Sequence, residues 1–98
     1  MIRTLLAALA CCACTLTAVA GPAERLAEAV RFRTISTQDP AQTDFAEFQR
    51  FNDFLRSTYP RVFAVLDVER VNEYSLLLTW QGSDPDAGAI LFTAHTDV

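Results

Sequence analysis

The sequence predicts an α/β fold in which two amphipathic helices precede three strands. Residues 22–32 and 44–58 carry apolar side chains at helical spacing, whereas three later stretches are short apolar runs bounded by turn residues. Helices followed by such strands are typical of a layered fold in which helices pack on a sheet. A chain of 98 residues allows one small domain at most, and its end directly after a strand leads us to expect an incomplete one.

The first predicted helix, 22–32, begins at Pro22, a residue that suits the first helical turn. Its apolar side chains lie on one approximate face, and charged residues lie opposite. Residues 33–42 are then predicted to be a linker, because they are rich in threonine and serine and contain the turn pair Asp39-Pro40.

The second predicted helix, 44–58, begins at Asp44, and Glu47 stands three residues later, as in a capping box. Tyr59-Pro60 should end this helix, since the residue before proline avoids helical geometry. One stripe at helical spacing holds four of the seven phenylalanines: Phe45, Phe48, Phe51 and Phe54, with Leu55 beside them. We interpret the stripe as the face that docks on a sheet rather than as an aromatic ligand site.

Three strands are predicted, at 62–71, 75–80 and 89–94. The first two are close enough in sequence to pair antiparallel through a short turn at 72–73. Residues 81–88 combine glycine, serine, aspartate and proline, which is a strong loop signal before the third strand.

Residues 1–20 are predicted to be a secretory signal peptide. Arg3 supplies the positive end, 5–16 is the apolar segment, and Ala18-Val19-Ala20 fits the small-residue rule for cleavage before Gly21. An uncleaved membrane anchor or a lipoprotein is the alternative, since this segment is at the short edge of bilayer-spanning length. We therefore expect an exported protein, with contact to a membrane only if the segment is retained.

Charge and cysteine content exclude several other classes. The net charge is −4, so nucleic-acid binding has no electrostatic support. All three cysteines lie within residues 1–20, so 21–98 offers neither a disulfide framework nor a cysteine metal site.

His95 and Asp97 are the candidate site residues, because they follow the third predicted strand, where α/β sheets place their ligands. Side chains two positions apart point to the same side of a strand. A lone histidine is usually structural or exposed, but metal-bound imidazoles commonly donate their second N–H to a carboxylate. We interpret His95 as a metal ligand and Asp97 as its partner, and this pair supplies only part of a zinc site.

The residues around this pair carry a family resemblance. Tyr74–Pro85 (YSLLLTWQGSDP) and Ala89–Val98 (AILFTAHTDV) resemble the first metal-binding segment of the M20 metallopeptidase family, most closely its carboxypeptidase S and N-fatty-acyl-amino-acid hydrolase branch. Residues 24–36 are similar to the opening helix of that branch and its following loop, and residues 45–54 also resemble that part of the branch. The resemblance implies that 21–98 is the N-terminal part of a three-layer, mixed-sheet, zinc-peptidase-like catalytic domain.

The resemblance also implies roles and partners. His95 aligns with the first zinc ligand of a site that holds two Zn²⁺ ions, and Asp97 aligns with the catalytic aspartate that orients this histidine. The implied substrates are small peptides or N-acyl amino acids. The other ligands and the general base of the family follow further along the chain, so we expect the 98 residues alone to be inactive.

Two further interpretations remain. The first is a non-catalytic, envelope-associated α/β module, or pseudoenzyme, that keeps the strand framework without a working site. The second is the start of a metallophosphatase or amidohydrolase, which is weaker because those enzymes favour Asp-x-His or His-x-His, whereas this chain has His95-Thr96-Asp97.

Overall fold

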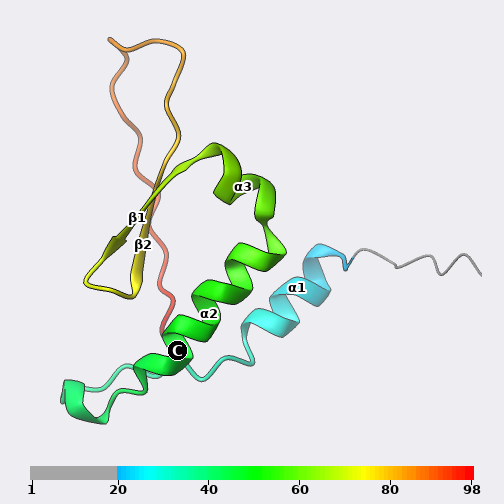
Figure 1. Cartoon of the computed structure of the whole chain (residues 1–98), viewed down its shortest axis with the longest axis vertical. Helices are drawn as coiled ribbons and strands as arrows, with labels where there is room; N and C mark the ends of the chain where they lie inside the picture. The colour runs from blue at the N-terminus through cyan, green and yellow to red at the C-terminus, as the bar shows by residue number, and fades with distance from the viewer. Residues whose placement is uncertain (1–19) are drawn as a thin grey trace, which may run out of the picture.

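The computed structural model describes residues 20–98, so the predicted signal peptide lies almost wholly outside the described residues. Helix α1 leads through a linker to the long helix α2, and a short helix, α3, connects α2 to a two-stranded hairpin (Figure 1). The rest of the chain loops away from the hairpin and returns toward the start of α2. The elements are α1 (Pro22–Ala29), the 3₁₀ turn η1 (Pro40–Gln42), α2 (Phe45–Thr58), α3 (Pro60–Val65), β1 (Asp67–Val71) and β2 (Ser75–Thr79).

Helix α1 begins at Pro22, as predicted, but ends at Ala29 instead of continuing to Phe32. Beyond Val30, the amides of Arg31 and Phe32 bond to carbonyls three residues back, at 3.1 and 3.3 Å, so the chain tightens into a final turn. This turn brings the Phe32 ring against two rings of α2, with centroid distances of 5.5 Å to Phe51 and 5.2 Å to Phe54. Tertiary packing of one aromatic side chain accompanies the early end of the helix.

Helix α2 has the predicted cap but not the complete capping box. The carboxylate of Asp44 accepts a hydrogen bond from the amide of Ala46 at 3.1 Å. Glu47 does not return this contact to Asp44, because its carboxylate accepts from the backbone N–H of Arg33 at 3.0 Å and from the guanidinium of Arg50. Glu47 therefore ties the linker after α1 to the first turn of α2.

The phenylalanine stripe of α2 was predicted to dock on a sheet, and it instead divides between two neighbours. Its C-terminal half contacts Phe32, and its N-terminal half contacts the hairpin turn. There the Phe45 ring stacks on Tyr74 with a centroid distance of 4.4 Å, and Phe48 lies 6.4 Å from the same ring. Beside them, Nδ2 of Asn52, which is only 5% exposed, donates to the carbonyl of Tyr74 at 2.8 Å.

The predicted strand 62–71 is wrong in its first half, because residues Pro60–Val65 form helix α3. Tyr59 leaves helical geometry, as expected before a proline, but Pro60 then starts a new helix. The guanidinium of Arg56 lies 4.7 Å from the centre of the Phe63 ring and links α3 to α2. The apolar residues that resembled strand alternation therefore belong to a short helical turn.

The hairpin confirms the predicted antiparallel pairing. Strands β1 and β2 pair from Asp67 opposite Thr79 to Val71 opposite Ser75. The turn lies at 72–74, and its first two residues, Asn72 and Glu73, have φ of 50° and 68°. Asparagine tolerates this left-handed geometry well, so the expected turn forms where the sequence placed it.

The third predicted strand, 89–94, does not form: within residues 20–98 the only sheet is the two-stranded hairpin. The segment has no strand ladder in the described part of the chain, and its apolar side chains are open to solvent, with exposures of 81% for Ile90 and 89% for Phe92. A small α/β arrangement is thus present, whereas a three-layer domain stays an expectation. No helix among the described residues is long and apolar enough to cross a bilayer.

Candidate metal-ligand site

The site forms where the end of the chain returns to the linker after α1. The hydroxyl of Thr34 donates to the carbonyl of Thr96 at 2.6 Å, and the amide of Val98 donates to the carbonyl of Thr34 at 3.0 Å. Thr34 is only 2% exposed, so these bonds are shielded from water on one side. They hold residues 96–98 alongside residues 34–36, although more than 60 positions separate the two segments in sequence.

The two sequence-predicted site residues contact each other. Nδ1 of His95 lies 2.9 Å from Oδ1 of Asp97. An ionised carboxylate only accepts hydrogen bonds, so this contact requires the proton on Nδ1 and leaves the lone pair of Nε2 free in the neutral ring. The imidazole is 91% exposed, which makes Nε2 accessible to a cation.

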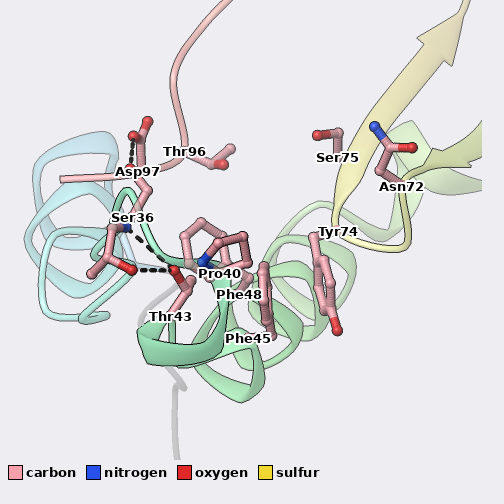
Figure 2. A pocket seen from close by; sticks show the side chains of 11 residues that line it. Ser36, Pro40, Thr43, Phe45, Phe48, Asn72, Tyr74, Ser75, Thr96 and Asp97 are labelled. Carbon is pink, nitrogen blue, oxygen red and sulfur yellow. Dashed lines mark hydrogen bonds between the residues drawn. The ribbon is translucent and has the colours of Figure 1, made fainter.

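Asp97 has a second partner, which sequence reasoning missed. Its Oδ2 accepts a hydrogen bond from the hydroxyl of Ser36 at 2.6 Å (Figure 2). The Ser36 hydrogen bond, followed by that of His95, lowers the pKa of Asp97 below its usual 3.8. Ser36 lies in the predicted linker, and no spacing rule connects it to a carboxylate 61 positions away.

A cavity of about 340 Å³ opens beside this contact. Figure 2 shows that its walls come from the linker, the start of α2, the hairpin turn and the last residues of the chain. Aromatic rings and a proline form an apolar side, and hydroxyls and the Asp97 carboxylate form a polar side. The lining residues are Ser36, Thr37, Pro40, Thr43, Phe45, Phe48, Asn72, Tyr74, Ser75, Thr96 and Asp97.

The donor set of the described residues fits part of a metal site. One imidazole nitrogen is free, and its ring is held by a carboxylate, which is the usual arrangement around a metal-bound histidine. No group of three or more histidine, cysteine, aspartate or glutamate side chains gathers within residues 20–98. A protein zinc site uses three or four such ligands, so the pair of His95 and Asp97 does not complete one by itself.

Comparison with known proteins finds relatives of one kind. The chain is 39% identical over 80 residues to carboxypeptidase S of Saccharomyces cerevisiae, a match that covers 76% of this chain and 14% of that protein. It is 39% identical over 72 residues to the probable carboxypeptidase S-like 1 of Dictyostelium discoideum, covering 72% of this chain and 15% of that protein. It is 32% identical over 77 residues to the N-fatty-acyl-amino acid synthase/hydrolase PM20D1 of Mus musculus, covering 76% and 15%.

The chain thus spans about one seventh of the length of these relatives. No family profile matches the chain, and no solved structure matches it.

Proposed function

Because this chain is homologous to carboxypeptidase S and PM20D1 of the M20 family, we propose that it is part of a zinc-dependent hydrolase. The substrates are small peptides or N-acyl amino acids, and the bond cleaved is an amide. The observation that carries this proposal is the 2.9 Å contact between Nδ1 of His95 and Oδ1 of Asp97, which leaves Nε2 exposed.

His95 and Asp97 have different roles in this proposal. His95 would hold the metal through Nε2, and a bound zinc ion supplies Lewis-acid polarisation of the amide carbonyl. Asp97 keeps the proton of the neutral imidazole on Nδ1 and fixes the plane of the ring. Because the pKa of Asp97 is lowered, its carboxylate stays ionised throughout the neutral range in which such an enzyme works.

The other ligands, the second zinc ion of the family site and the general base are assigned to parts of the intact protein outside this chain. This assignment is supported by the length of carboxypeptidase S, of which the chain matches 14%. A single imidazole and one carboxylate neither close a zinc site nor provide a separate base. The 98 residues by themselves are therefore proposed to be inactive.

The apolar side of the cavity is suited to a non-polar part of the substrate. Phe45 and Tyr74 present stacked rings within the same cavity that Asp97 borders. Ligand-binding sites combine apolar walls with a few polar groups that fix the orientation of the ligand.

Export is part of the proposal, with residues 1–20 removed as a signal peptide before Gly21.

The proposal is tested with His95→Ala in the intact protein, with Ser83→Ala in the exposed 81–88 loop as the matched control. Zinc content and hydrolysis of dipeptides and N-acyl amino acids are measured for both variants. His95→Ala should lose bound zinc and nearly all hydrolysis, whereas Ser83→Ala should keep both. Wild-type zinc content and turnover in His95→Ala would refute the role of His95, and absence of both from the wild type would favour a non-catalytic module.

A further inference from the structure

Among the described residues of the linker, only Ser36 forms a side-chain hydrogen bond with the candidate pair. Its hydroxyl donates to Oδ2 of Asp97 at 2.6 Å, while Oδ1 of the same carboxylate faces Nδ1 of His95 at 2.9 Å. The three side chains therefore form a continuous line of hydrogen bonds, from Ser36 through Asp97 to the imidazole.

The two oxygens of one carboxylate are fixed relative to each other, so holding one of them also aims the other. Asp97 is partly open to solvent, with 36% of its side chain exposed, and without a second anchor its carboxylate would rotate and hydrate freely. The hydrogen bond from Ser36 is charge-assisted and short, which makes it one of the stronger kinds. It thus limits the directions from which Oδ1 can accept the hydrogen bond of the imidazole N–H.

The hydroxyl of Ser36 is not needed to hold the two segments together. Thr34 already does so, through its buried hydroxyl on the carbonyl of Thr96 and its carbonyl on the amide of Val98. Ser36 is itself exposed, so removal of its hydroxyl leaves no cavity in a packed core. The hydrogen bond from Ser36 to Asp97 therefore affects the orientation of the site residues and is not required for the fold.

We propose that Ser36 is a positioning residue that orients the Asp97 carboxylate, and through it the His95 imidazole, for metal binding. This inference rests on the proposed function, because the imidazole must bind a metal for its orientation to matter. Removal of an outer partner of a metal-bound histidine commonly costs about 10–100-fold in metal affinity. Ser36 acts one bond further out, so we expect Ser36→Ala to weaken zinc binding by about 3–10-fold.

The experiment measures zinc affinity by chelator competition in the intact protein for wild type, Ser36→Ala and Ser36→Thr. Ser57→Ala is the matched control, because the Ser57 hydroxyl bonds at 2.9 Å to the carbonyl of Phe54 within α2. Thermal melts are recorded for each variant, together with the visible spectrum of the cobalt-substituted protein, which reports ligand geometry. Ser36→Ala should bind zinc more weakly and alter the cobalt spectrum at an unchanged melting temperature, whereas Ser36→Thr and Ser57→Ala should match the wild type.

Each other outcome overturns the inference. Unchanged zinc affinity in Ser36→Ala removes the positioning role, and so does an equal loss in Ser36→Thr, which keeps the hydroxyl. Unfolding of Ser36→Ala would assign the hydroxyl to the fold instead of the site. His95→Ala separates failure of the proposed function from failure of the role of Ser36. If neither His95→Ala nor Ser36→Ala changes zinc binding, the proposed function fails. If His95→Ala abolishes zinc binding and Ser36→Ala leaves it unchanged, only the role of Ser36 fails.

Discussion

Replacement of Asp97 by asparagine is the sharpest test of the pair at the end of this chain. Asparagine has nearly the same shape, but its side chain has one accepting oxygen and one donating NH₂ group. Asp97 accepts two hydrogen bonds, one on each oxygen, from Ser36 and from His95. The amide can accept only one of these in the present geometry, so one of the two partners must be abandoned or rearranged.

The size of the loss expected in Asp97→Asn depends on how exposed the His95 and Asp97 side chains are to solvent. An outer carboxylate that supports a metal-bound histidine is worth about 10–100-fold in metal affinity or activity. The imidazole is 91% exposed and Asp97 is 36% exposed in the described residues, so water can replace part of the lost interaction. We therefore expect Asp97→Asn in the intact protein to fall near the lower end, at about tenfold.

The assay is zinc affinity and turnover of an N-acyl amino acid, measured for the wild type and Asp97→Asn. Asp84→Asn in the 81–88 loop is the control, since its carboxylate caps only a local turn at the amide of Asp86. If the Asp97 side chain served only as a cap for neighbouring backbone amides, asparagine would serve equally well, because it is as good a cap as aspartate. Wild-type zinc affinity and turnover in Asp97→Asn would therefore refute the reasoning.

Three further predictions follow from the fold and from the predicted signal peptide. Asn52→Ala should lower the free energy of unfolding by about 0.5–1.5 kcal/mol in urea titrations, since it removes the partly buried hydrogen bond to the carbonyl of Tyr74; an unchanged midpoint would contradict this. Glu47 has a pKa below its usual 4.5, chiefly through the side chain of Arg50 and then the N–H of Arg33, so its contribution to stability should be complete above pH 4.5 and lost as the pH falls through the lowered value. Melting temperatures should accordingly depend less on acid pH in Glu47→Gln than in the wild type, and equal dependence would count against the contact. N-terminal sequencing of the exported protein should begin at Gly21, and a sequence that begins at Met1 would contradict signal-peptide cleavage.

Local signals in the sequence predicted the starts of α1 and α2 and the position of the hairpin turn. Pro22 and Asp44 mark the starts of α1 and α2 because each satisfies or avoids an unpaired amide in the first helical turn. Asn72 marks the hairpin turn because its side chain tolerates positive φ. These features depend on one or a few neighbouring residues, and a single sequence contains all the information that they need.

The same reasoning was wrong for residues 60–65, because six residues are too few to distinguish the helical period from the strand period. Val62, Phe63 and Val65 are compatible with strand alternation and also with one helical turn. The helix forms after Pro60, and the ring of Phe63 then packs beneath Arg56. That contact joins two helices and is not visible in the local pattern.

In the candidate site, too, the contact between near neighbours in sequence was predictable and the contact between distant residues was not. His95 and Asp97 are two positions apart, so their contact could be expected from spacing, and a 2.9 Å approach is present even though the segment before them forms no strand. Ser36 could not be expected, because it reaches Asp97 only after the chain has returned along the linker. The line from Ser36 to the imidazole therefore depends on two hydrogen bonds of Thr34, one from its hydroxyl to the carbonyl of Thr96 and one from the amide of Val98 to its own carbonyl, which hold residues 96–98 against the linker. Any change that opens this junction should disturb the candidate ligand without touching it, and this makes the linker after α1 part of the site.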